Sequence, residues 1–205
     1  MEKKGYHITH EASCVISDEY TGLHSKEEYN SIVQHVFDLI RAAYTLFKNG
    51  NYAPCLFLSI TIFEEIAKIK AGYMRAWGKD IKKIKRGKDP LFHHGKKHKI
   101  SLDTLYLIGG RIINSIGKER ANEIFEGYQT GSYSSLKESS LYFSRTHQGL
   151  HIPSERVNIT LAGEHLLLAI EIFSDEFWGM TVETSEICDG TDEMYLEIEA
   201  VFKHS

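Results

Sequence analysis

Two long helical patterns joined by a very short turn are the feature of this sequence that most restricts its fold. Across residues 26–48, apolar side chains recur at steps of three and four, which places them on one face of a helix. Residues 55–77 are apolar nearly all the way round, as in a helix that is buried on most sides. Asn49 and Gly50 end the first pattern, and Pro54 fits the first turn of the second. Because the turn is so short, we expect an antiparallel hairpin of two helices.

Most of the remaining sequence also favours helices, so the predicted fold class is all-α, a bundle with a basic loop between helices. The other expected helices cover residues 101–115, 118–129, 158–178 and, as a short acidic segment, 192–203. Ser25 and Glu28 form a capping-box pattern before the first long helix, and Ser101 is expected to cap the helix after the basic loop. β-branched residues at 60–62 leave a strand as an alternative there, but the length of the run favours a helix.

The composition is that of one globular domain with flanking segments. The chain has 205 residues, of which 42% are apolar and 25% charged, and its longest uncharged stretch is too short and too polar to span a bilayer. We therefore expect no membrane association. No apolar leader follows the first residues and the three cysteines are widely spaced, so we expect free thiols and a cytoplasmic protein. The expected organisation is an N-terminal extension over residues 1–24, a helical domain over 25–180 and an acidic tail over 181–205.

Charge is distributed unevenly along the chain, whose formal net charge is −4. Residues 79–99 hold eight lysines and one arginine against two aspartates, a local charge of +7, whereas residues 181–205 carry −6. A basic segment on an otherwise acidic protein indicates a local anion-binding site more than a general nucleic-acid coat. The alternative is a loop and a tail whose charges contact only solvent.

Charged side chains interrupt the second long helix at Glu64-Glu65-x-x-Lys68. Glu64 and Lys68 are four residues apart, which puts them on one helix face, where they can pair. In one interpretation these charges form a stripe that faces solvent. In the other, they meet cationic groups from elsewhere, such as Arg145 or the basic segment, because a buried carboxylate is costly unless it is partnered. We expect at least one of the two carboxylates to be partly buried and paired.

Histidines cluster in two places, but neither cluster has the spacing of a metal site. The first, with His93, His94 and His98, contains a glycine and no cysteine, and the second contains His147 and His151. No histidine has a glutamate three residues before it, which excludes the ligand pattern of di-iron bundles. The sequence also lacks the common signatures of phosphate-binding loops, hydrolases, zincins and dithiol redox sites. We therefore predict no metal ion and no cofactor.

Four motifs follow one another in a recognisable order. They are Ala43-x-x-Leu46-Phe47-x-Asn49-Gly50-x-Tyr52-x-x-Cys55, Ile62-Phe63-Glu64-Glu65-Ile66-Ala67-Lys68, Phe92-x-His94-Gly95-Lys96-Lys97 and Leu136-Lys137-Glu138-Ser139-Ser140-Leu141-Tyr142-Phe143. This order resembles the AbiV family of abortive-infection proteins, a branch of the HEPN helical superfamily, over roughly residues 27–178. The Glu-Glu-x-x-Lys helix is the most specific of the four. His93 and Lys96 have the same His-x-x-Lys spacing as His94 and Lys97, so the register of that motif stays open.

The resemblance implies a bacterial anti-phage protein with an HEPN-like helical bundle that dimerises. Many HEPN proteins are RNases that need no metal ion and use Arg-x(4–6)-His, which Arg145 and His151 match, with His147 as the competing histidine. A histidine can take and return protons during cleavage of a ribose phosphate, and an arginine can hold the phosphate. The resemblance also implies a polar site made of Glu64, Glu65, Lys68, His94 and Lys97.

Two classes of function stay open at this point. In the first, the protein cuts RNA, whose backbone Lys96, Lys97 and Lys99 of the basic segment would hold. In the second, it is a non-catalytic binding protein that docks a phage or host component and blocks translation or phage development. The expected partners are a second copy of the chain, RNA, and a phage-encoded activator protein. Convergence of Arg145 and His151 in one cleft across a dimer would favour the first class.

Overall fold

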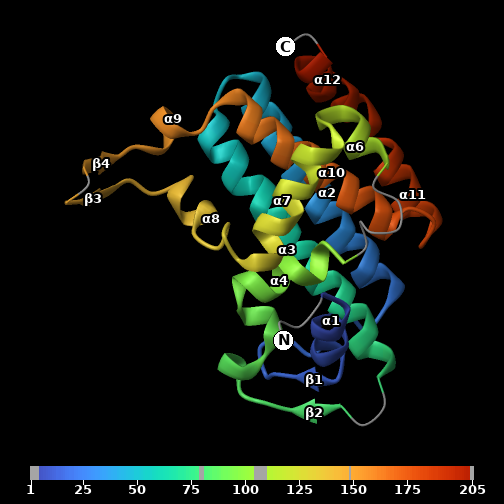
Figure 1. The fold of residues 1–205 in the computed structure, drawn as a ribbon. Helices are drawn as coiled ribbons and strands as arrows, with labels where there is room; N and C mark the ends of the chain where they lie inside the picture. The colour runs from blue at the N-terminus through green and yellow to red at the C-terminus, as the bar shows by residue number, and fades with distance from the viewer. Residues whose placement is uncertain (1–4, 79–80, 104–109, 148, 204–205) are drawn as a thin grey trace.

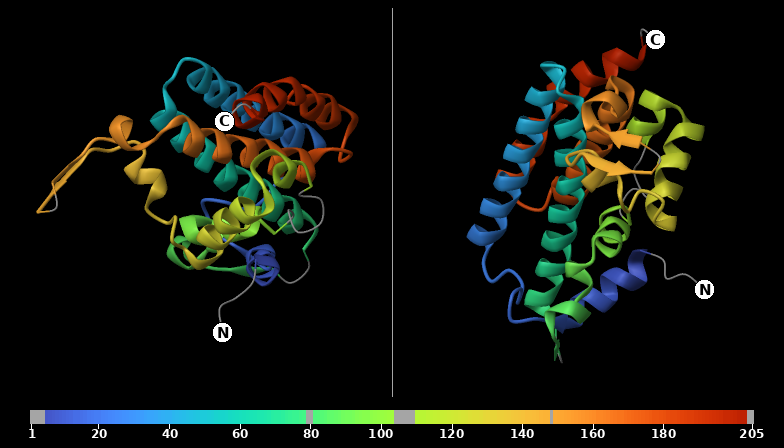
Figure 2. Two further views of the ribbon diagram at one scale, coloured as in Figure 1. Left: turned by 45° about the horizontal axis from the view of Figure 1, so that its top comes forward. Right: turned by 90° about the vertical axis from the view of Figure 1, so that its left-hand side faces the viewer.

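Three long helices form the centre of the molecule in the computed structural model, which describes residues 5–78, 81–103, 110–147 and 149–203. They are α2 (Lys26–Lys48), α3 (Tyr52–Trp77) and α10 (Ile159–Phe177). α2 and α3 form the expected antiparallel hairpin, and α10 packs against both of them (Figure 1 and Figure 2). Within the described ranges the fold is an all-α bundle with two small two-stranded sheets, which confirms the predicted fold class.

The local sequence signals agree with the helices that enclose the core. The Ser25 hydroxyl oxygen caps α2 by accepting a hydrogen bond from the Glu28 backbone N–H at 3.1 Å. α3 includes residues 60–62, so the strand alternative is wrong. α7 (Lys118–Thr130), α10 and α12 (Asp192–Lys203) confirm three further predicted helices. Buried apolar side chains from α2, α3 and α10 form one continuous core.

The acidic end of the chain packs on the same bundle. α11 (Val182–Asp189), a helix that we did not predict, contacts α2 and α10. α12 contacts α10 and α6 (Gly110–Ile116). No described helix has both the length and the apolar character needed to cross a bilayer.

The basic segment differs from its prediction. We expected a loop up to residue 100 and a helix capped by Ser101, but α4 (His94–Ser101) is helical and Ser101 is its last residue. Side chains of α4, Ile100 among them, are buried, and the helix packs against α3. This burial offsets the low helix propensity of Gly95. The expected helix over 101–115 is found only as α6, since residues 104–109 lie outside the described residues.

Before α4, the chain crosses the end of the bundle in short elements. β2 (Lys82–Lys83) pairs in parallel with β1 (Val15–Ile16), and two single turns follow, η1 (Arg86–Lys88) and η2 (Pro90–Phe92). α1 (Gly5–Ser13) packs on α3 and α4. Residues 5–24 therefore contact the bundle directly, and the expected division of the chain at residues 24 and 180 stays a prediction.

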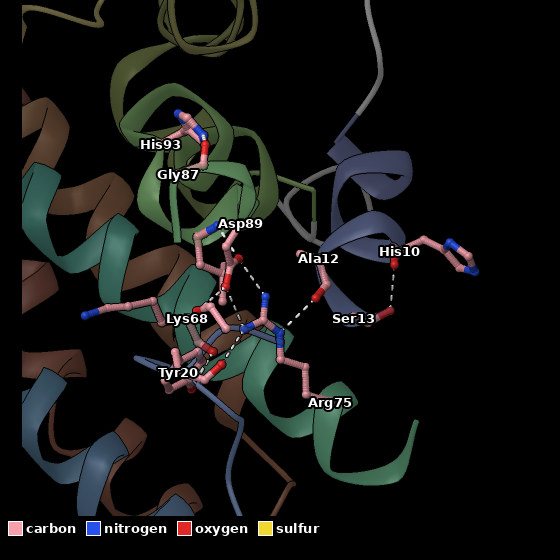
Figure 3. A network of polar contacts seen from close by, with 11 residues as sticks. His10, Ala12, Ser13, Tyr20, Lys68, Arg75, Gly87, Asp89 and His93 are labelled. Carbon is pink, nitrogen blue, oxygen red and sulfur yellow. Dashed lines mark hydrogen bonds and ion pairs between the residues drawn. The ribbon is translucent and has the colours of Figure 1, made fainter. Parts of the chain in front are cut away.

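A buried ion pair fixes these elements to α3 (Figure 3). The side chains of Arg75 and Asp89 are both 0% exposed, and the guanidinium donates to the two carboxylate oxygens at 2.7 and 3.1 Å. Arg75 also donates to the backbone carbonyls of Ala12 and Tyr20. Asp89 accepts a third bond from the Leu91 backbone N–H, which begins η2. The pair thus joins the end of α3, the N-terminal segment and the chain that leads into α4.

A two-stranded hairpin projects from the bundle between α8 (Leu136–Ser139) and α9 (Pro153–Arg156) (Figure 1 and Figure 2). Its strands are β3 (Ser144–Thr146) and β4 (Gly149–His151), which pair antiparallel. We predicted no helix or strand here. Apolar side chains at the base and along the hairpin are exposed, including Tyr142 at 62% and Phe143 at 73%. Such a group of exposed apolar side chains is typical of an interaction surface.

Candidate functional site

A buried carboxylate surrounded by cationic groups lies in the middle of α3. The Glu64 side chain is only 3% exposed. Its oxygen Oε1 accepts a hydrogen bond from His94 Nδ1 at 2.6 Å, and Oε2 accepts from Lys97 Nζ at 2.5 Å. Lys137 Nζ lies 3.2 Å from Oε2, and His98 Nε2 lies 3.4 Å from Oε1. Three separate elements, α3, α4 and α8, therefore meet at one carboxylate, which we call the Glu64 site.

Glu64 is ionised in this environment. Burial by itself would raise the pKa of a carboxyl group. The close contacts of His98, Lys97 and His94 with the carboxylate oppose that effect and, together with the Lys97 charge, hold the pKa of Glu64 well below its ordinary value. The site therefore contains one negative charge and two lysine ammonium groups. Its net charge is positive, which favours binding of an anion.

The alternative in which Glu64 pairs with Lys68 on a solvent-facing stripe is wrong. Lys68 instead contacts Glu65, with Nζ 2.5 Å from Oε2, and both of these side chains are partly exposed. Glu64 turns inward because α4 and α8 supply buried cations there. The interpretation in which the charges meet cationic groups from elsewhere is therefore the correct one for Glu64. Its partners come from the basic segment and from α8, and Arg145 is not among those that the structure gives it.

Within α4, the structure selects one His-x-x-Lys register for the site. His94 and Lys97 both bind Glu64, whereas the ring of His93 contacts the backbone carbonyl of Gly87 through Nε2 at 3.1 Å. The His94 Nδ1–H donates to the carboxylate, which leaves Nε2 directed away from it. The His94 side chain is 53% exposed, so this second nitrogen is accessible from solvent.

Sequence reasoning missed two members of the site, His98 and Lys137. His98 lies four residues after His94, on the same face of α4, but that signal is readable only once the segment is known to be helical. Lys137 lies in the last of the four motifs quoted above, and its ammonium also lies over the Phe57 ring at 5.2 Å. Its contact with Glu64 depends on α8 packing against α3.

Uncharged aromatic side chains lie beneath the Glu64 site. The Tyr128 ring contacts the rings of Phe63, His98 and His165. Burial lowers the pKa of His165 to about 4, so its imidazole is neutral at physiological pH. Tyr128 Oη and His165 Nε2 are buried with no hydrogen-bond partner in the part of the chain that the structure describes. The charges that balance Glu64 therefore come from α4 and α8 and not from these aromatic side chains.

Arg145 and His151 lie on the projecting hairpin and point to opposite faces of it. Ser144 pairs with His151, and Arg145 pairs with Leu150. Paired residues of neighbouring strands share a face, so Ser144 and His151 point to the same face of the hairpin. Arg145 follows Ser144 in its strand and therefore points to the opposite face. Arg145 and His147 are exposed. A single chain therefore does not bring Arg145 and His151 into one cleft.

His151 is nevertheless connected to the Glu64 site through α8. Its Nε2–H donates to the backbone carbonyl of Ser139 at 2.7 Å. Ser139 is the last residue of α8, and Lys137 in the same single-turn helix contacts Glu64. α8 therefore contacts two motifs that are far apart in the sequence. Its Lys137 contacts the Glu-Glu-x-x-Lys helix, and its Ser139 contacts the Arg-x5-His segment.

The three lysines expected to hold RNA divide between two places. Lys96 and Lys99 line a groove of about 480 Å³ together with His93, Glu11 and other residues of α1, α4 and the end of α7. Lys97 faces inward to Glu64. Among the described residues, no three or more His, Cys, Asp or Glu side chains are grouped as metal ligands would be.

Comparison with known proteins gives one family. The family model described as AbiV, of the HEPN type, matches residues 24–174, which is well over half of the chain. The match spans α2, α3, α4, α8 and the hairpin, and so it includes every residue of the Glu64 site. No curated protein and no solved structure matches this chain.

Proposed function

The chain belongs to the AbiV family of HEPN-type abortive-infection proteins, and from that premise we propose that it acts in phage defence by cutting RNA without a metal ion. The observation that carries the proposal is the position of α8. This helix holds His151 at one end and contributes Lys137 to the Glu64 site at the other. A histidine attached to the helix that carries Lys137 is suited to proton transfer next to a bound phosphate.

The reaction needs three things from the protein. A base must take the proton of the ribose 2′-OH, an acid must protonate the leaving 5′ oxygen, and cations must balance the charge that develops on the phosphate. We assign the phosphate to Arg145, whose guanidinium is exposed, and proton transfer to His151, with His147 as the competing histidine. Lys96 and Lys99 in the basic groove would hold the RNA backbone, and Lys97 would add positive charge from the Glu64 site.

This assignment requires a second copy of the chain. Arg145 and His151 lie on opposite faces of the hairpin, so the arginine that joins a given histidine comes from a partner hairpin. Tyr142, Phe143 and Leu150 provide exposed apolar surface on which such a contact can form. The proposed active form is therefore a homodimer with paired hairpins.

Cleavage is tested with the purified protein and RNA in the presence of EDTA. We expect cleavage that persists in EDTA, leaves 2′,3′-cyclic phosphate ends and weakens as salt rises, because the lysines bind phosphates by charge. Arg145→Ala and His151→Ala should each lower the rate, whereas His147→Ala should leave it near the wild-type value. If His147→Ala is the slow variant, then His147 takes the role assigned to His151. A wild-type protein that leaves RNA intact would contradict the proposed function.

The dimer is tested by light scattering at micromolar concentration. We expect twice the chain mass of 23.4 kDa. The double variant Tyr142→Ser/Phe143→Ser should shift the mass to that of one chain, since it removes apolar contact surface from both hairpins. Leu196→Ser is the matched control, because Leu196 is also an exposed apolar residue but lies on α12. An unchanged mass in the hairpin variant would place the contact elsewhere.

The exposed apolar hairpin also favours a second candidate function, that of a non-catalytic binding protein. In that case the hairpin docks a phage or host component, such as a phage-encoded activator protein, and defence works by blocking translation or phage development. Phage protection separates the two candidates. The triple variant Arg145→Ala/His147→Ala/His151→Ala loses protection if the protein is an RNase. It keeps protection if the protein only binds, while Tyr142→Ser/Phe143→Ser then loses it.

A further inference from the structure

We infer that His94, held in place by Glu64, is the general base that takes the 2′-OH proton during RNA cleavage. The inference rests on the proposed RNase function and adds to it a catalytic residue outside the Arg145–His151 hairpin. Glu64 would be a positioning residue, since its carboxylate contacts the His94 ring and is itself buried away from RNA.

Glu64 fixes the orientation of the His94 ring. Nδ1–H donates to Glu64 Oε1 at 2.6 Å, which fixes both the ring and its tautomer. The lone pair on Nε2 is then free and directed outward, and the side chain is about half exposed. A base oriented by a carboxylate, with its other nitrogen open to substrate, is the arrangement used in histidine-dependent nucleophile activation.

The Glu64 site does not need His94 for charge balance. Lys97 and Lys137 both contact Oε2, so two ammonium groups already face the single carboxylate. A purely structural ion-pair cluster would be satisfied by these two buried lysines. His94 instead occupies the other oxygen, Oε1, and extends to the surface. From that position the outward nitrogen, Nε2, can accept a proton.

Positive charge exceeds negative charge around the carboxylate that holds His94. Glu64, Lys97 and Lys137 together carry a net charge of +1, whereas Lys96 and Lys99 line a groove on the opposite face of α4. A phosphodiester that reaches His94 therefore enters a cationic environment. Lys97 of α4 and Lys137 of α8 then attract the phosphate, and His94 removes the neighbouring hydroxyl proton.

His94 Nε2 takes the proton of the ribose 2′-OH, the 2′ oxygen forms a bond to phosphorus, and the bond from phosphorus to the 5′ oxygen breaks. The leaving 5′ oxygen takes a proton from the imidazolium of His151, which stays attached to α8 through Ser139. The products are a 2′,3′-cyclic phosphate and a 5′-OH. Exchange with water then removes the proton from His94 and returns one to His151.

The test compares His94→Ala with His35→Ala, which removes an exposed histidine from α2, far from both motifs in the sequence. His94→Ala should lower the cleavage rate in EDTA by about 10²–10⁴-fold, and added imidazole should restore part of it, because a free base can occupy the vacated position. His35→Ala should cleave like wild type. A cluster that only supports the fold would not respond to imidazole.

The role of Glu64 is tested in the same assay. Glu64→Gln should slow cleavage in an otherwise wild-type chain and have no further effect in the His94→Ala background, because Glu64 acts through that ring. Circular dichroism shows whether each variant is folded. A wild-type chain that cleaves RNA while His94→Ala retains its full rate overturns the inference and leaves the RNase proposal standing. A wild-type chain that cannot cleave RNA overturns both.

Discussion

Asp89→Ala is expected to lower the free energy of unfolding by about 3–5 kcal/mol, because it leaves the Arg75 guanidinium buried without its carboxylate. Both side chains of this pair are 0% exposed, so water cannot take the place of the missing oxygens. The Leu91 N–H and the Ser17 hydroxyl also lose their acceptor. Since Asp89 begins η2, which leads into α4, the position of His94 and Lys97 against α3 is expected to be disturbed as well.

Urea denaturation followed by circular dichroism measures this effect. Asp18→Ala is a matched control, because Asp18 pairs with Lys83 of the same basic segment but at the surface. Such an exposed pair contributes under about 1 kcal/mol. Equal losses of stability in Asp89→Ala and Asp18→Ala would show that the Arg75–Asp89 pair does not anchor the basic segment to α3.

Glu64→Ala is expected to have an effect of similar size, about 3–5 kcal/mol, since it leaves Lys97 and Lys137 facing each other without an anion. Glu65→Ala is the control one residue away. Its carboxylate pairs with Lys68 in the partly exposed i,i+3 contact, so we expect a loss under about 1 kcal/mol. The difference between adjacent glutamates measures what burial contributes. Losses that are equal for the two variants would contradict the structure of the Glu64 site.

The same variants give a pH dependence with a definite sign. The pKa of Glu64 is lower in the folded protein than its ordinary value of 4.5, so the unfolded chain takes up a proton first as the pH falls. The stability that Glu64 contributes is therefore complete above about pH 4.5 and is lost in more acidic solution. We expect the difference in unfolding free energy between wild type and Glu64→Ala to shrink as the pH is lowered from 6 to 3.

Prediction of the helices succeeded because their signals are local. The steps of three and four in α2, the Ser25 cap and the apolar run of α3 depend only on neighbouring residues. The helix α4 was not predicted, because its sequence lacks an apolar period and contains Gly95 and five cationic or histidine side chains in eight residues. It is helical because Ile100 and other side chains are buried against the rest of the fold. Nothing in its own sequence reports that contact.

The candidate site shows the same division. The sequence alone established that a charged pair of glutamates interrupts a helix buried on most sides, and therefore that at least one of them needs a cation. It could not establish which cation. Helical spacing pointed to Lys68, whereas the tertiary structure supplies His94, Lys97 and Lys137, which lie 30, 33 and 73 residues away along the chain.

The physical reason is the difference between local geometry and packing. Helix periodicity and capping follow from backbone dihedrals, which each short stretch of sequence sets for itself. The partners of Glu64, the separation of Arg145 from His151 across a hairpin and the attachment of His151 to α8 all depend on how distant segments pack. The sequence thus determined an all-α chain with a buried charge in its central helix, and only the tertiary structure decided which side chains surround that charge.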